Sequence, residues 1–187
     1  MISNDLKLVI PVRDDLYAYH VPISSEVFEA NYRIIAATKA QLAGKGVYYQ
    51  MDTGPRIAAM ALRDEGKRDA ELRGDFDETG KPKDAAQSFL TELKRLTTIL
   101  GPTPAGWEPM PVDAAIHNGV LDPDEWQEAL SAIVFFTCHY ALAKKAQRSE
   151  VADAVAGILS ASITASSVSE YASSLKKSTA DGSSAAT

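Results

Sequence analysis

Residues 75–80 have the best spacing for chemistry in this chain. An acid, a second acid, a hydroxyl and a glycine occupy the positions they hold in the first half of a calcium-binding loop. The twelfth position of such a loop needs a bidentate glutamate, and here it holds Ala86. Lys81 and Lys83 also bring positive charge to the place where a cation would bind. We therefore predict a solvated loop with no metal.

The same acids resemble the nucleophile motif of haloacid-dehalogenase-type phosphatases, which requires a buried apolar strand directly before the aspartate. Residues 71–74 read Glu-Leu-Arg-Gly, which is no such strand. An enzyme that uses Asp75, Asp77 or Cys138 is the least favoured hypothesis. The substitution Asp77→Ala would test it through loss of activity.

The thiol and imidazole groups are the next candidates. Cys138 is the only cysteine, so the chain forms no internal disulfide, which fits a reducing compartment. His139 is its neighbour, but adjacent residues on a helix point about 100° apart and do not form a chelating pair. His20 and His117 have no metal-type partner at short spacing. A Cys138 nucleophile with a distant histidine is the alternative, but the place of Cys138 in an apolar helix predicts an inert core thiol.

Two further motifs are incomplete. Gly44-Lys45-Gly46 lacks the spacing and the following Lys-Ser/Thr of a phosphate-binding loop. No Gly-x-Ser-x-Gly elbow occurs. The sequence therefore predicts no catalytic residue, no cofactor and no metal site, and favours a binding protein over an enzyme.

Aromatic side chains are the remaining candidates, for protein binding. Trp107 lies in residues 101–111, where four prolines exclude a helix. We interpret this segment as a rigid connector that Trp107 pins to the core, with a binding role as the alternative. Tyr48 and Tyr49 lie in the segment between two expected helices. They are either exposed for binding or packed under the loop.

The N-terminal part predicts a β-hairpin. Residues 6–12 and 16–21 are β-type runs around a polar turn at residues 13–15. Pro11 and Pro22 cannot donate to a ladder, so we expect edge strands or strand ends.

Helical spacing of apolar residues predicts most of the remaining elements. One helix begins at Ser24, whose hydroxyl can cap it, and a second begins at Thr53. Residues 66–84 are rich in charge and glycine and poor in large apolar side chains, which predicts an exposed loop. Further helices are expected over residues 85–100 and 112–117.

The clearest local signal is the capping box at Asp122, with proline at the first helical position and Glu125 three residues on. We expect this helix to run to Arg148. It is apolar nearly all round, so we predict the central core helix. Helices over residues 151–163 and 167–175 follow, the second opened by another capping box at Ser167. Residues 176–187 have almost nothing to bury and predict a disordered tail.

These elements predict a mainly α fold of the α+β class, in one domain over residues 1–175 of the 187. The net charge of −6 disfavours nucleic acid as a partner. No apolar run approaches the 18 or so residues of a membrane span, and the first residues lack the pattern of a signal peptide. We expect a soluble protein that stays where it is made.

Several segments, taken in order, resemble small proteins encoded among the tail genes of long-tailed bacteriophages. The resemblance covers about residues 6–175. The matching segments are Val21-Pro22-Ile23-Ser24, Glu26-Val27-Phe28-Glu29, Gly54-Pro55-Arg56-Ile57-Ala58, Gly106-Trp107-Glu108, Pro111-Val112-Asp113, Ala132-Ile133-Val134-Phe135-Phe136-Thr137 and Ser169-Glu170-Tyr171-Ala172-Ser173-Ser174-Leu175.

Such proteins are similar to tail assembly chaperones, and the resemblance implies a concrete role. These helical proteins bind the long, apolar tape-measure protein, keep it soluble and help recruit tail-tube subunits. They act in the host cytoplasm and are absent from the finished virion. Many also exist in a longer form made by a ribosomal frameshift, and Leu175-Lys176-Lys177 lies where such a frameshift could occur. The family offers no catalytic residues, cofactor or metal.

Two other partnerships stay open at this point. Homo-oligomers are compatible with the sequence. A structural virion protein of the neck or tail, of the connector or tail-terminator type, is the alternative to a chaperone, since such proteins form rings from small mixed domains.

Overall fold

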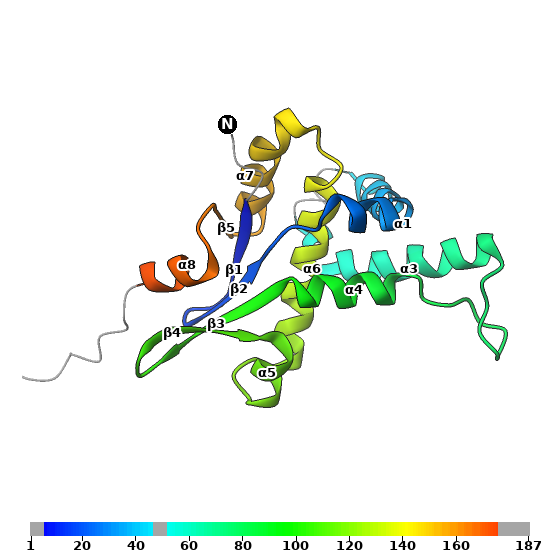
Figure 1. Ribbon diagram of the computed structural model, residues 1–187. Helices are drawn as coiled ribbons and strands as arrows, with labels where there is room; N and C mark the ends of the chain where they lie inside the picture. Colours follow the sequence, from blue (N-terminus) through cyan, green and yellow to red (C-terminus); the bar gives the residue numbers. More distant parts are fainter. Residues whose placement is uncertain (1–5, 47–51, 176–187) are drawn as a thin grey trace, which may run out of the picture.

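The computed structural model describes residues 6–46 and 52–175. A five-stranded antiparallel sheet, in the order β4-β3-β2-β1-β5, lies beside a group of helices (Figure 1). The elements, in chain order, are β1 (Lys7–Arg13), β2 (Leu16–His20), α1 (Ser25–Ala43), α3 (Gly54–Arg73), α4 (Ala86–Arg95), β3 (Thr97–Thr103), β4 (Gly106–Pro111), α5 (Val112–His117), α6 (Pro123–Tyr140), the 3₁₀ turn η1 (Lys145–Gln147), α7 (Arg148–Ile158), β5 (Ser162–Thr164) and α8 (Val168–Ser174).

The predicted α+β class is confirmed, but the sheet is larger than the predicted hairpin. The hairpin itself is β1 and β2, with Val9 opposite Tyr19. Of the two predicted alternatives, edge strands are wrong, because β1 also pairs with β5 and β2 also pairs with β3. The other alternative, a strand end, holds for Pro22, because β2 ends at His20. Pro11 is tolerated because β5 pairs only with residues 7–9 of β1, so the proline lies beyond its end.

Two segments predicted without strands form the β3–β4 hairpin. The helix expected over residues 85–100 ends at Arg95, and β3 begins at Thr97. The apolar residues Ile99 and Leu100 of β3 are both buried, on opposite faces of the sheet. The supposed connector over residues 101–111 is instead the end of β3, the turn and the whole of β4. Pro109 and Pro111 are tolerated because β4 is an edge strand, and Pro102 is tolerated because it lies beyond residues 97–100, the part of β3 that pairs with β2.

The predicted exposed loop over residues 66–84 is wrong in its first part. Helix α3 continues to Arg73 and stops at Gly74, which adopts a left-handed conformation with φ 69°. Gly66 lies where α4 approaches, and a Cβ there would lie 2.8 Å from the backbone nitrogen of Ala86. The charge density that indicated a loop belongs to the exposed face of an amphipathic helix. Lys67, Arg68 and Glu71 lie on this exposed face, whereas half-buried Asp69 pairs with Arg33 of α1 at 2.9 Å.

Helix α6 forms the centre of the core, as predicted. Both hydrogen bonds of the capping box at Asp122 are present, and the helix contacts α1, α3, α4, α7 and β1. It ends at Tyr140 and not at Arg148, because the basic residues that follow leave the core. Its twelve buried residues make it apolar on nearly every side.

The C-terminal elements differ in one respect from the prediction. Helix α7 ends at Ile158, after which Ser160 has a φ of 51° and β5 joins the sheet, where a single helix was expected over residues 151–163. The capping box at Ser167 is present and opens α8. The tail predicted over residues 176–187 lies outside the described residues. No helix in the described ranges has the length and apolar character to cross a membrane.

Candidate protein-binding site

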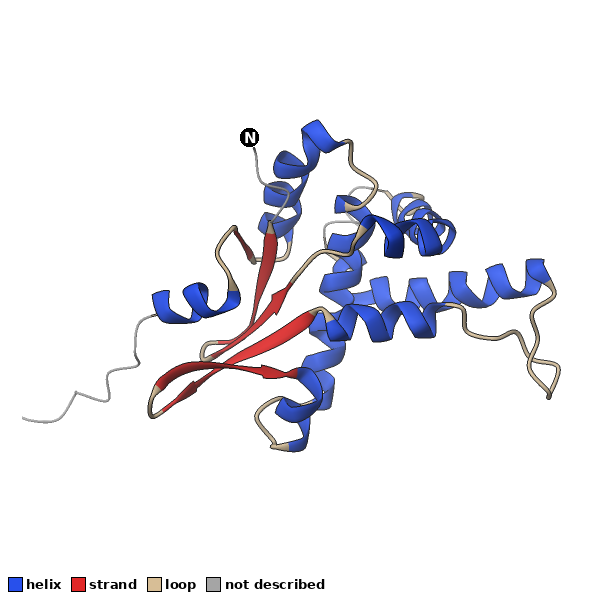
Figure 2. Cartoon of the chain, viewed as in Figure 1, coloured by secondary structure: helices blue, strands red, loops and turns tan. Residues whose placement is uncertain are grey.

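The two faces of the sheet are covered very differently, as Figure 2 shows. The inner face packs against the helical layer around α6. The other, which we call the outer face, is formed by Val9, Tyr17, Tyr19, Leu100 and Trp107. Of the helices, it is α8 that packs on this cluster.

Trp107, the tryptophan predicted from the sequence, lies on this outer face. It sits on β4 opposite Pro102, and its ring contacts Tyr17 at 5.3 Å between centroids, tilted by 50°. Both aromatic side chains are half-buried. Trp107 thus contributes to an aromatic surface on a strand, where the sequence suggested a pin for a loop.

Helix α8 covers part of the outer face through a stripe of side chains at helical spacing. Ala172 is buried, and half-buried Val168, Tyr171 and Leu175 pack around it. The ring of Tyr171 lies 6.2 Å from that of Tyr19. This stripe was legible in the sequence, because it has the 3.6-residue period of an amphipathic helix, but nothing in the sequence shows which surface it meets.

Tyr19 ties the segment before α8 to the sheet. Its hydroxyl donates to the backbone oxygen of Ser166 at 2.7 Å. Burial raises the pKa of this phenol, and the nearby carboxylate of Glu170 raises it further. The phenol therefore stays protonated at neutral pH and keeps its hydrogen bond.

Tyr48 and Tyr49, the other two aromatic candidates, lie outside the described residues. Their predicted binding role stays a prediction.

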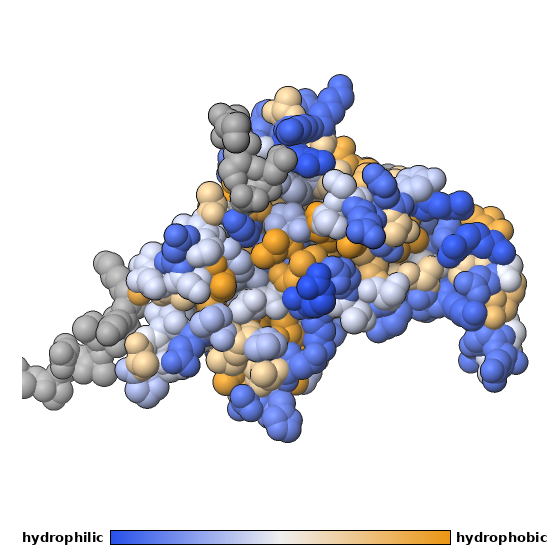
Figure 3. Space-filling model, viewed as in Figure 1, coloured by the Kyte–Doolittle hydropathy of each residue, from blue (hydrophilic) through white to orange (hydrophobic). Residues whose placement is uncertain are grey.

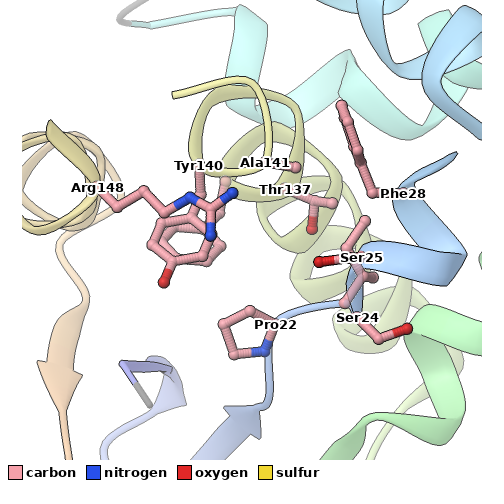
Figure 4. A pocket seen from close by; sticks show the side chains of 10 residues that line it. Pro22, Ser24, Ser25, Phe28, Thr137, Tyr140, Ala141 and Arg148 are labelled. Atoms are coloured by element: carbon pink, nitrogen blue, oxygen red, sulfur yellow. The ribbon is translucent and has the colours of Figure 1, made fainter. Parts of the chain in front are cut away.

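A small cavity, which we call the end pocket, opens where α6 ends (Figure 4). Its volume of about 50 Å³ has room for about four water molecules, the size of one side chain and far below that of a cofactor site. It is lined by Pro22, Ile23, Ser24, Ser25, Phe28, Phe136, Thr137, Tyr140, Ala141 and Arg148. Sequence reasoning missed this site, because more than a hundred residues separate the two parts of its lining.

The chemistry-bearing residues singled out from the sequence are not brought together. Asp77 accepts hydrogen bonds from the backbone and hydroxyl of Thr79 and from the backbone of Lys81, and these bonds lower its pKa. Asp75 forms an ion pair with Lys83 at 2.9 Å. No group of three acidic, histidine or cysteine side chains that could hold a metal occurs in residues 6–46 and 52–175.

The thiol and imidazoles are equally separate. Burial raises the pKa of Cys138 to about 12, so the thiol stays protonated. Burial lowers the pKa of His20 to about 3 and also lowers that of His139. His20 bonds Thr97 through Nδ1 at 3.0 Å, and His139 bonds the backbone oxygen of Phe135 at 2.8 Å. His117 is exposed at the end of α5.

Comparison with known proteins identifies no relative: no family model, no curated protein and no solved structure matches this chain. Figure 3 shows apolar side chains gathered in the middle of the drawn face, between the sheet and the helices. The outer face and the end pocket are the surfaces on which a protein partner could place apolar groups.

Proposed function

We propose that this chain is a non-enzymatic tail assembly chaperone of a long-tailed bacteriophage. In this role it binds the tape-measure protein in the host cytoplasm, helps recruit tail-tube subunits and is absent from the mature virion. The observation that carries the binding role is the outer face of the sheet, where a half-buried aromatic pair, Tyr17 and Trp107, lies beside a single short helix.

The chemistry of this face suits an apolar helical client. Aromatic rings offer large contact areas at little cost in side-chain entropy. Pro109 and Pro111 cannot donate hydrogen bonds from β4, the edge strand on this side, which disfavours addition of a further strand. A client helix lying beside α8 would instead make side-chain contacts of the helix-in-groove kind.

Co-expression with the tape-measure protein from the same tail gene cluster tests this proposal. We expect the client to co-purify with the chain and to become soluble. Trp107→Ser should weaken the complex at least about tenfold, the usual loss for a central aromatic anchor. The matched control is Tyr32→Ser, which removes an aromatic that is 54% exposed on α1, away from the sheet.

Three results would count against the proposal. One is a client that stays insoluble and does not co-purify. A second is equal weakening by Tyr32→Ser and Trp107→Ser, which would remove the outer face as the binding site. The third is stoichiometric presence of the chain in purified virions by mass spectrometry, which would replace the chaperone with a structural neck or tail protein.

A further inference from the structure

The loop after α3 forms an ordered projection, which we call the finger (residues 74–84). Phe76 and Pro82 pair across it as an antiparallel bridge. At its tip the Asp77 carboxylate accepts three hydrogen bonds from Thr79 and Lys81, which fix the turn. Figure 2 shows this loop extending from the body beyond the end of α3. The finger therefore presents its side chains in a defined arrangement.

The finger carries an apolar group that the fold does not cover. Phe76 is 46% exposed, although it belongs to a residue type that is usually buried. Acids surround it in the sequence at Asp75, Asp77 and Glu78. Glu78 is exposed and makes no ion pair within residues 6–46 and 52–175. An aromatic ring with an acid beside it is thus available to a partner.

The end pocket has the complementary properties. Phe28, Phe136 and Tyr140 line it, and the last two rings stack at 5.1 Å. The guanidinium of Arg148 lies over the Tyr140 ring at 5.7 Å (Figure 4). No acidic side chain of the described part of the chain pairs with Arg148. The pocket thus offers an aromatic lining of one-side-chain size beside an unneutralised cation.

We propose that the finger of one copy of this chain inserts Phe76 into the end pocket of a second copy. The Phe76 ring would pack against the aromatic lining, and Glu78 would approach Arg148, where charge complementarity fixes the register. The basic residues Lys144 and Lys145, which follow α6 and are exposed, add to the attraction. The phenyl ring and the carboxylate of the finger thus match the aromatic lining and the guanidinium of the end pocket.

The contact has to form between copies. The finger lies beyond the far end of α3, whereas the pocket lies where α6 ends and α1 begins (Figure 1). Each copy therefore keeps one finger and one pocket available, and such a contact joins copies either reciprocally in pairs or head to tail. This self-association does not depend on the tail client, so either proposal can fail without the other.

Sedimentation of the purified full-length chain over a concentration series tests the contact. We expect the wild-type chain to associate, and Phe76→Ser and Arg148→Glu each to raise the dissociation constant at least about tenfold. Mixing these two variants should restore a dimer, because the first keeps an intact pocket and the second an intact finger. The matched control is Met60→Ser, which removes an apolar side chain that is 66% exposed on α3, outside the finger.

Each remaining outcome overturns the proposal. A wild-type chain that stays monomeric at several hundred micromolar excludes the contact. A mixture of the two variants that stays monomeric shows that finger and pocket do not meet. Equal dissociation by Met60→Ser and Phe76→Ser assigns the association to general surface hydrophobicity. Circular dichroism establishes that every variant is folded before these results are interpreted.

Discussion

The two faces of the sheet differ in the layer that covers them. The inner face packs against α6 and its neighbouring helices, and its cluster contains most of the buried apolar residues of the described chain. On the outer face a small cluster of three buried sheet residues, Val9, Tyr19 and Leu100, packs with Ala172 of α8. We therefore expect equally buried residues on the two faces to contribute unequally to the free energy of unfolding. What matters besides burial is how readily the covering layer can move.

Strand β3 offers the sharpest test of this difference, because Ile99 and Leu100 are adjacent and both fully buried on opposite faces. We expect Ile99→Ala to lower the free energy of unfolding by about 4 kcal/mol. The cavity would open against the rigid core around α6, which cannot collapse to fill it. Urea unfolding at pH 7 measures the loss. A loss below about 2 kcal/mol would show that the inner layer adapts as easily as the outer one.

A buried imidazole on the inner face, that of His20, should make the free energy of unfolding depend on pH. His20 points into the inner layer, where burial lowers its pKa from 6.5 to about 3. Its Nε2 has no hydrogen-bond partner in the described residues. Below pH 6.5 the unfolded chain takes up a proton there that the folded chain does not accept until about pH 3. The stability contributed by neutral His20 is therefore complete above pH 6.5 and is lost as the pH falls towards 3.

The expected size of this effect is about 1.4 kcal/mol for each pH unit, or about 3 kcal/mol between pH 6.5 and pH 4. Urea unfolding of the wild-type chain and of His20→Phe at several pH values measures it. Carboxylates titrate equally in both proteins, so the difference between the two slopes isolates His20. If the free energy of unfolding changes with pH equally in the two proteins, the imidazole is protonated in the folded chain.

Leu100→Ala is the outer counterpart of the β3 test. We expect it to lower the free energy of unfolding by about 2 kcal/mol, half the effect on the inner face, because α8 can shift to fill part of the cavity. Urea unfolding under the same conditions gives the comparison directly. Equal losses for Ile99→Ala and Leu100→Ala would contradict the proposed difference between the layers.

The parts of the fold that were predictable are those that local sequence signals determine. Local signals identified the starts of helices well: Ser24, Asp122 and Ser167 each accept the predicted capping hydrogen bond. Strands were missed where the sheet overrode the local pattern, as at Ile99, which lies at helical spacing from Leu96 but pairs with Ala18 of β2. The partner of a strand is a tertiary fact that helical or β periodicity does not contain.

The candidate sites also divide into one with a local sequence signal and one that forms only through tertiary packing. Trp107 was singled out as a candidate because a tryptophan among prolines is conspicuous in any sequence. The end pocket was not, because Phe28 and Arg148 come together only through the packing of α1 and α7 at the end of α6. Residues 66–73 were misjudged because an amphipathic helix with a charged face resembles a loop in composition.

The two capping boxes extend the comparison to the covering helices and give the smallest expected effects. Asp122 caps α6 in the inner layer, and Ser167 caps α8 on the outer face. Asp122→Ala should lower the free energy of global unfolding by about 1 kcal/mol, the usual cost of a lost N-cap. Ser167→Ala removes the same kind of cap, but it should change global unfolding by less, because α8 can detach while the rest of the fold stays intact.

Amide hydrogen exchange separates these two cases. Ser167→Ala should speed exchange in α8 alone and leave the amides of α6 unchanged. Asp122→Ala should instead speed exchange of the slowest amides in proportion to its loss of global stability. If α8 and α6 exchange together in the wild-type chain, the outer helix unfolds only with the core. The outer face would then be held as firmly as the inner one, and a client could use only the half-buried residues beside α8, Tyr17 and Trp107.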